Sequence, residues 1–254
     1  MDERKVCVVT GASSGIGAAI VRRYAREGWH VVLNHSKSAA AADAVAADCR
    51  AFGVQALVLQ GNVALDADCL AVAAEVQRVF GRCDVLVNNA GTTKFVPARD
   101  LQGLQAEDFH RIVDVNVIGP FQMTRALLPL LQLRGGAVVN MSSVASLTGA
   151  GSSIAYAASK GALNTLTQAL ARALGPTVRV NAIAPGFVET PWLQQGLGPD
   201  RYEQGKQAYK ARAVLDAVIS PDDVADAAWW LGAGAAKTTG EVIPVDAGAR
   251  MLRV

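Results

Sequence analysis

The alternation of short apolar runs with helix-like segments constrains this chain most. Runs typical of buried strands occupy residues 5–10, 30–34, 56–60, 84–89, 136–143, 177–185 and 241–248. Apolar residues recur at helical spacing between these runs. This order favours a parallel sheet with helices on both faces, because each right-handed crossover returns its helix to the sheet. The sequence therefore predicts a Rossmann-type, doubly wound α/β fold of about seven strands. We expect a single domain over residues 1–254.

Composition and charge argue against several functional classes. The net charge is +2, and the basic residues form no block, so nucleic acid is not the expected partner. No apolar run approaches the length of a membrane span, and the charged start "MDERKV" does not resemble a signal peptide. The four cysteines and three histidines are scattered, so we expect no metal site. Reduced thiols in a cytoplasmic protein are the simplest interpretation.

A glycine-rich segment, "TGASSGIG", directly follows the first predicted strand and opens the first helix. A turn of this kind can bring bare backbone and helix N–H groups to a pyrophosphate. Its position between strand and helix favours a nucleotide site over a purely structural turn. The turn residues that we expect to contact the nucleotide are Gly11, Ser13, Ser14, Gly15, Ile16 and Gly17.

Two tyrosine–lysine pairs have the spacing of one helical turn, "YAASK" at 156–160 and "YEQGK" at 202–206. Residues four apart share a helix face, so each lysine can lie beside its tyrosine. An ammonium about 4 Å away, at an effective dielectric of about 20, contributes about 4 kcal/mol. That is enough to lower a phenol pKa from about 10 to about 7, where it could exchange protons. Spacing alone does not choose between the pairs.

Five motifs, "TGASSGIG", "NNAG", "NMSS", "YAASK" and "PGFVET", resemble in order those of the short-chain dehydrogenase/reductase family. The resemblance covers essentially the whole chain. It implies that Tyr156 exchanges a proton with the substrate oxygen, that Lys160 holds the nicotinamide ribose, and that Ser143 hydrogen-bonds the carbonyl. Ser143 stands thirteen residues before Tyr156, as in the family, whereas Tyr202 has no such serine. Ser142 is the alternative, but on a strand it should face the opposite way.

Asn116 completes the expected catalytic set. It lies in "DVNVIGPF", four residues before Pro120. A proline cannot donate to the carbonyl at i−4, so the helix should kink and leave the Asn116 carbonyl free to hold a water. The resemblance implies a proton-relay water between this asparagine and Lys160. An ordinary asparagine at a helix break is the alternative.

The resemblance also implies cofactor contacts outside the glycine turn. Asn62 stands where the family often has an aspartate near the adenine, and an amide oxygen can still accept from the adenine amine. These further contacts, which include the catalytic tyrosine and lysine, are Asn62, Val63, Asn89, Ala90, Gly91, Tyr156, Lys160, Pro185, Gly186, Val188 and Thr190. Asn89 could instead only tie the sheet together.

The end of the second predicted strand bears on cofactor choice. Members selecting NAD(H) place a carboxylate there, but this chain has His35, followed by Ser36 and Lys37. A hydroxyl, an ammonium and an imidazole suit a 2′-phosphate, so the sequence predicts NADP(H), with NAD(H) possible. Ser14 stands where many NADP-selective relatives carry an arginine, which predicts a modest preference. An exposed, solvated Lys37 is the alternative.

We therefore expect an NAD(P)(H)-dependent oxidoreductase acting on a small-molecule carbonyl or secondary alcohol. The alternatives are a 3-oxoacyl-[acyl-carrier-protein] reductase of fatty-acid synthesis and a non-catalytic nucleotide sensor. Residues 187–213 are the expected substrate lid. The helix carrying "YAASK" is apolar or small on its other faces, and Trp229 and Trp230 are expected to be exposed. Two such surfaces predict a homotetramer.

Overall fold

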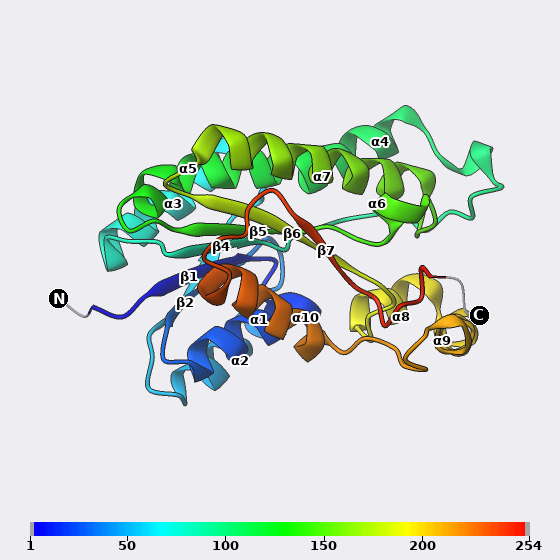
Figure 1. Ribbon diagram of the computed structural model, residues 1–254, viewed down its shortest axis with the longest axis horizontal. Coiled ribbons are helices and arrows are strands. Elements are labelled where there is room, and N and C mark those ends of the chain that lie inside the picture. The colour runs from blue at the N-terminus through cyan, green and yellow to red at the C-terminus, as the bar shows by residue number, and fades with distance from the viewer. Residues whose placement is uncertain (1–2, 252–254) are drawn as a thin grey trace.

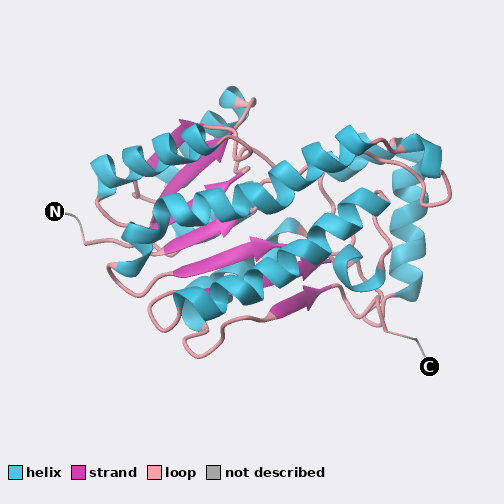
Figure 2. Cartoon of the chain, turned by 90° about the horizontal axis from the view of Figure 1, so that it is seen from above, coloured by secondary structure: helices cyan, strands magenta, loops and turns pink. Residues whose placement is uncertain are grey.

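The computed structural model describes residues 3–251, which form one seven-stranded parallel sheet. The spatial order is β3-β2-β1-β4-β5-β6-β7, so the chain reverses its winding direction between β1 and β4 (Figure 2). This confirms the predicted doubly wound α/β fold, and every predicted strand segment carries a strand. The strands are β1 Val6–Thr10, β2 His30–His35, β3 Ala56–Gln60, β4 Val85–Asn88, β5 Ala137–Met141, β6 Arg179–Pro185 and β7 Val242–Val245.

Helices cover both faces of the sheet, and one apolar core lies under each layer (Figure 1). The strands are apolar on both sides because both faces are buried. One layer consists of α1 Gly15–Arg26, α2 Ala39–Arg50 and α10 Pro221–Trp229. The other consists of α3 Asp66–Phe80, α5 Gly119–Gln132 and α7 Ile154–Leu174.

The structure contradicts the expectation that Trp229 is exposed. Its ring packs edge-to-face against Tyr24 and Trp29, with centroids 5.0 and 5.5 Å away. The helical turn at the end of α10 points it towards α1, where an aromatic cluster accepts it. Only Trp230, 47% exposed, faces outward as predicted.

The shorter elements lie mostly beyond the carboxyl ends of the strands, where a doubly wound sheet binds ligands. Figure 1 shows α6, α8 and α9 at that end. These elements are η1 Leu101–Gly103, α4 Ala106–Val113, η2 Asp114–Ile118, α6 Ala145–Thr148, α8 Pro191–Leu197, α9 Pro199–Arg212 and η3 Trp230–Gly234. None of the helices within residues 3–251 has the length and apolar character to cross a membrane.

Candidate active site

The glycine turn brings bare backbone together between β1 and α1. Gly11 and Gly15 adopt positive φ values of 63° and 52°, which glycine tolerates without strain. A Cβ on Gly17 would lie 2.3 Å from the Gly11 oxygen, and one on Gly11 would lie 2.9 Å from Ala90 Cα. The first N–H groups of α1 have no partners inside the helix, so the turn is built to hold a phosphate. This fits a dinucleotide.

Asn89 holds the turn in place. Its Nδ2 donates to the Thr10 and Gly11 oxygens, both at 2.9 Å, and the Thr10 hydroxyl accepts from the Asn89 and Ala90 N–H groups. Asn88 instead donates to Asn140 Oδ1 on β5 at 2.9 Å. The second asparagine therefore shapes the turn and lines the cavity beside it, while the first ties the sheet together.

A cavity of about 490 Å³ joins this turn to three of the four predicted catalytic residues, and Asn116 is not among its lining residues. It lies where β1, β4, β5 and β6 end, and Ser143, Tyr156 and Lys160 all line it. Ser153 caps α7 by accepting from the Tyr156 N–H at 3.2 Å, which fixes the start of the helix that carries Tyr156 and Lys160.

Burial shifts the pKa values of the central pair in opposite directions. Burial raises the pKa of Tyr156 to about 12, and the hydrogen bond with Ser143 partly offsets this rise. Burial lowers the pKa of Lys160, only 3% exposed, to about 8. The Lys160 ammonium donates to the Met141 oxygen at 2.7 Å. In the protein itself desolvation outweighs the attraction of Lys160, so a phenol pKa near neutral stays a prediction for the site with an oxidised nicotinamide bound.

The two serines after β5 have different tasks. Ser142 is buried and donates to Asn164 Oδ1 on α7 at 2.6 Å. Ser143 bonds the Tyr156 phenol, and its hydroxyl also accepts from the Ala145 N–H at 3.1 Å. The structure thus brings Ser143 to the phenol and uses Ser142 to fix α7.

Asn116 lies at the centre of η2, a π-helical turn between α4 and α5. The break predicted at Pro120 takes this form, since the proline sits in the first turn of α5. The Asn116 side chain is fully buried and clamps Thr92, accepting from its N–H at 2.8 Å and donating to its oxygen at 2.9 Å. It also donates to Ser159 on α7 at 3.0 Å, a contact that the sequence analysis missed.

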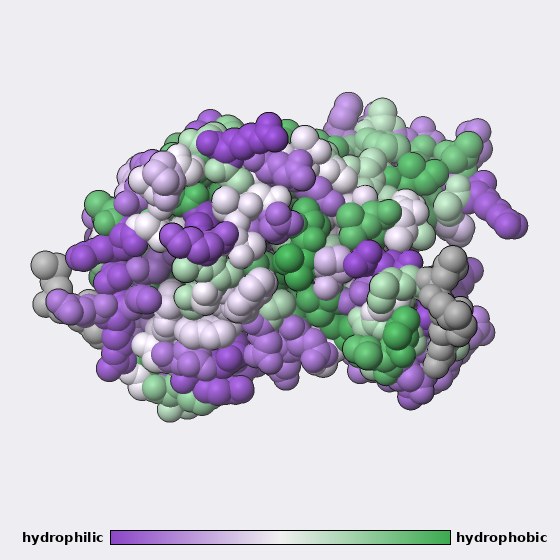
Figure 3. Space-filling view, in the orientation of Figure 1, coloured by the Kyte–Doolittle hydropathy of each residue, from purple (hydrophilic) through white to green (hydrophobic). Residues whose placement is uncertain are grey.

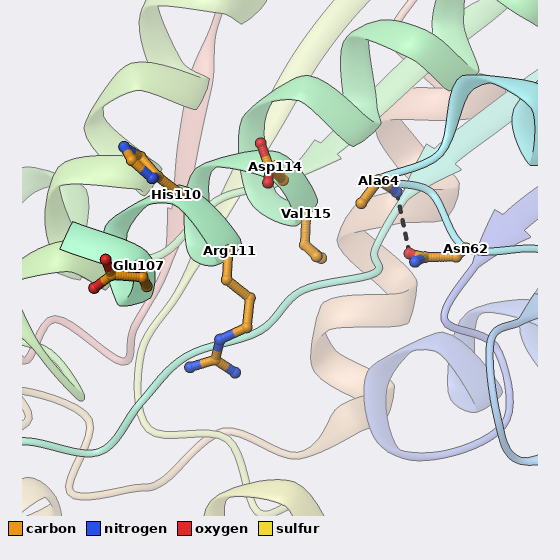
Figure 4. A pocket seen from close by; sticks show the side chains of 7 residues that line it. All are labelled: Asn62, Ala64, Glu107, His110, Arg111, Asp114 and Val115. Carbon is orange, nitrogen blue, oxygen red and sulfur yellow. Dashed lines mark hydrogen bonds between the residues drawn. The ribbon is translucent and has the colours of Figure 1, made fainter. Parts of the chain in front are cut away.

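Ala90 and Gly91, expected beside the adenosine half of the cofactor, line the large cavity, whereas Asn62 and Val63 do not. Asn62 is exposed and borders a second cavity of about 370 Å³ between the β3–α3 loop and α4 (Figure 4). Its Oδ1 accepts from the Ala64 N–H at 3.1 Å, so one lone pair is already used (Figure 4). Val63 is buried and its oxygen accepts from Gln122 at 2.9 Å. Its apolar side chain therefore belongs to the core.

His35 ends β2 and is only 5% exposed. Within the described part of the chain, its buried Nδ1 has no hydrogen-bond partner. Ser36 and Lys37 follow it on the surface. The three residues are adjacent, as predicted, but they lie apart from the residues that line the large cavity.

The predicted lid contains α8 and α9. A Cβ on Gly186 would lie 1.8 Å from the Tyr209 hydroxyl, which donates to the Asp246 oxygen at 2.7 Å. Tyr209 therefore docks α9 against the sheet end, although nothing in its local sequence distinguishes it. The predicted cofactor contacts in this region all line the cavity, and they are Pro185, Gly186, Val188 and Thr190.

The second tyrosine–lysine pair lies on α9, and neither member is among the residues lining the cavity. Lys206 forms an ion pair with Glu189 instead. The first pair is the one placed at the site.

Comparisons with known proteins agree with this geometry. A family model described as enoyl-(acyl carrier protein) reductase matches residues 11–250. A Streptomyces violaceoruber protein named as ketoacyl reductase 2 of the granaticin polyketide synthase is 41% identical over 98% of both chains. A 3-oxoacyl-[acyl-carrier-protein] reductase of Staphylococcus aureus is 35% identical over 99% of this chain and 100% of its own.

Solved structures of other proteins also resemble this chain in sequence and fold. A protein from Burkholderia xenovorans, described as a short-chain dehydrogenase/reductase, is 42% identical, has a TM-score of 0.90 and covers 98% of this chain and 99% of its own. An NAD⁺-bound xylitol dehydrogenase is 28% identical, with a TM-score of 0.88 over 98% of this chain and all of its own. The chain is an oxidoreductase that belongs to the short-chain dehydrogenase/reductase family.

Proposed function

We propose that this protein reduces ketones of small molecules with NADP(H), and that Tyr156 is the proton donor. The observation that carries the proposal is the convergence of Ser143, Tyr156 and Lys160 in one cavity with the glycine turn. The pKa of Tyr156, raised to about 12, keeps the phenol protonated at neutral pH, so it is ready to donate. This is the protonation state that a proton donor in carbonyl reduction requires.

The chain's own residues account for the proton transfer. When bound, a nicotinamide cofactor supplies the hydride for the carbonyl carbon. Ser143 and Tyr156 hydrogen-bond the carbonyl oxygen, and the Tyr156 proton moves to that oxygen, leaving a phenolate. The ammonium of Lys160 stabilises this phenolate and holds the ribose. We assign the Asn116 carbonyl to a water that returns the proton through Lys160.

The preference for NADP(H) rests on the end of β2. The glycine turn and the segment from Pro185 to Thr190 would hold the pyrophosphate and the nicotinamide, with Ala90 and Gly91 between them. His35, Ser36 and Lys37 offer hydrogen-bond donors and no carboxylate to a ribose 2′-phosphate. The unpartnered, buried Nδ1 of His35 supports a polar role there, within the limits of the residues described.

A second candidate is reduction of a 3-oxoacyl thioester on an acyl carrier protein. The names of the ketoacyl-reductase relatives favour it. The same catalytic residues would serve, and the acidic carrier would need a basic surface. Arg134 could contribute to it, whereas "LGPT" at 174–177 adds no charge. A non-catalytic nucleotide sensor is disfavoured because such a protein needs the glycine turn but not Ser143, Tyr156 and Lys160 together.

The test is oxidation of NADPH and NADH, followed by absorbance, across cyclic ketones, diketones, ketoses and β-keto thioesters. We expect turnover of a free ketone, faster with NADPH. Turnover of carrier-bound thioesters alone would favour the second candidate. Tight cofactor binding with no turnover of any carbonyl would favour the sensor.

We also propose a homotetramer in the cytoplasm. The free, buried cysteines of the described chain suit a reducing compartment. Exposed apolar residues on α5, α7 and near β7 support assembly through two surfaces.

A further inference from the structure

Two aromatic rings from distant segments meet above the catalytic tyrosine. Phe95 lies in the loop after β4, and Trp192 lies in α8 of the lid. Their ring centroids are 5.4 Å apart with the planes tilted by 53°, and the Trp192 centroid is 6.4 Å from that of Tyr156. All three rings line the same cavity. We call Phe95 and Trp192 the aromatic roof.

Gly196 makes room for the roof. A Cβ at this position would lie 2.0 to 2.7 Å from three atoms of the Phe95 ring. Gly196 follows Trp192 by four residues, so both face the same side of α8. The Phe95 ring therefore packs directly against the backbone of α8 at residue 196, which is possible only because this residue has no side chain.

Hydrogen bonds to residues near the predicted catalytic residues hold the loop that carries Phe95. Beside Phe95, the Val96 N–H donates to the Ser152 oxygen at 2.9 Å, and the Thr93 hydroxyl bonds the Ser152 hydroxyl at 2.7 Å. The same loop begins at Thr92, which Asn116 clamps. Phe95 is thus positioned by the residues around the catalytic set, and its contact with α8 ties the lid to them.

The chemistry of the cavity favours an apolar, flat occupant. Trp192 lines the cavity, and its side chain is not fully covered by the protein, since it is 43% exposed. Val144, Leu193 and Leu197 line the cavity as well. In the stretch from 3 to 251, the charged lining residues are Lys160, which is buried, and Arg212. An open indole face stacks best on another ring.

We propose that the aromatic roof is the specificity determinant of this enzyme and selects ketones carried on or beside a flat ring system. Phe95 and Trp192 contact the ring, and Gly196 positions Phe95. This inference rests on the proposed function, because it names the class of substrate reduced at the Tyr156 site.

The experiment compares 1-tetralone, a flat ring ketone, with 2-decanone, an open-chain ketone of equal carbon number. The readout is the ratio of their kcat/KM values, which is independent of the amount of folded enzyme. We expect the wild type to prefer 1-tetralone. Phe95→Leu, Trp192→Leu and Gly196→Ala should each lower the ratio about three- to tenfold, the range that aromatic pairing supplies beyond buried area. Phe52→Leu, on an exposed ring beyond α2, should leave it unchanged.

Each remaining outcome has a defined meaning. A ratio near one in the wild type, or an unchanged ratio in Trp192→Leu and Phe95→Leu, overturns the roof while the proposed function stands. Reduction of a β-keto thioester with no reduction of either ketone overturns the roof and favours the second candidate function. Absence of reduction of every carbonyl tested overturns the proposed function as well.

Discussion

The Lys160 ammonium lies 5.6 Å from the centroid of the Tyr156 ring, inside a site whose burial favours the neutral form of both groups. Proton transfer from the phenol changes this balance, because a phenolate then faces an ammonium at short range. The attraction is therefore largest after the proton has left. In the proposed mechanism, Lys160 therefore stabilises the transition state more than the resting phenol.

Tyr156→Phe should lower kcat by about 10²- to 10⁴-fold, because general acid catalysis typically contributes that much. Cofactor affinity should change little, since the ring and its contacts remain. Stopped-flow kinetics and cofactor titration separate the two effects. Tyr202→Phe, the matched change in the pair on α9, should be close to silent. Near-normal turnover of Tyr156→Phe would refute the assignment.

Lys160→Met should stabilise the folded protein at pH 7 while abolishing activity. The pKa of Lys160 falls from 10.5 to about 8 on folding, so the buried charge costs stability fully below about pH 8. The cost shrinks as pH rises towards 10.5 and then vanishes. A shift of about 2.5 units corresponds to about 3 kcal/mol, reduced by about 1 kcal/mol for the lost bond to Met141.

Urea unfolding at pH 7 and pH 10 measures this difference. The stability gain of Lys160→Met should be present at pH 7 and small at pH 10. A variant that is less stable than the wild type at pH 7 would show that the ammonium is well solvated or paired, contrary to its burial.

Gly17→Ala should destabilise the protein by about 1–3 kcal/mol and abolish cofactor binding, because the added methyl meets the Gly11 oxygen. Gly161 is the matched control, since it also lies inside a helix but has open space around a Cβ. Gly161→Ala should stabilise by about 0.5–1 kcal/mol. Thermal unfolding measures both. An equal loss of stability in Gly161→Ala would mean that the cost of Gly17→Ala does not come from the contact with the Gly11 oxygen.

His35→Asp should shift selectivity towards NADH. The new carboxylate would accept from a ribose 2′-hydroxyl and repel a 2′-phosphate. The measurement is the ratio of kcat/KM for NADPH to that for NADH. Lys37→Ala should lower the same ratio because kcat/KM falls for NADPH while kcat/KM for NADH stays unchanged. A wild-type enzyme that already favours NADH would contradict the assignment of His35, Ser36 and Lys37 to a site for the 2′-phosphate.

The strands, and the three residues Ser143, Tyr156 and Lys160 that meet in one cavity, were predictable because each rests on local pattern. Strand segments alternate with helices along the chain. The numbers of residues that separate Ser143, Tyr156 and Lys160 are those seen in the short-chain dehydrogenase/reductase family. Phe95 was not predictable in this way. Its partners Trp192 and Gly196 lie about one hundred residues away, and only the folded chain brings α8 over the loop after β4.

One prediction failed for a physical reason that local sequence does not carry. Trp229 was expected to be exposed, but α1 offers Tyr24 and Trp29 as ring partners, and this aromatic contact exists only once α10 packs. The burial that raises the pKa of Tyr156 is likewise a property of the whole fold, and the spacing of Tyr156 and Lys160 does not indicate it.

The proposed tetramer predicts that the surface near β7 carries one of two interfaces. β7 is an edge strand whose residues are half-buried, and Figure 3 shows hydrophobic residues gathered over it. Trp230 adds an exposed ring nearby, while Phe121 and Ile154 are exposed on α5 and α7. Two different isologous contacts close a tetramer, and loss of one leaves a dimer.

Light scattering at micromolar concentration should therefore give a mass of about four chains of 26.4 kDa. Trp230→Glu should give dimers, because a carboxylate cannot be buried in an apolar interface without large cost. Leu70→Glu, on the outer face of α3, is the matched control and should remain tetrameric. A monomeric wild-type protein would refute the proposed tetramer. A tetrameric Trp230→Glu protein would show that Trp230 is not part of the second interface.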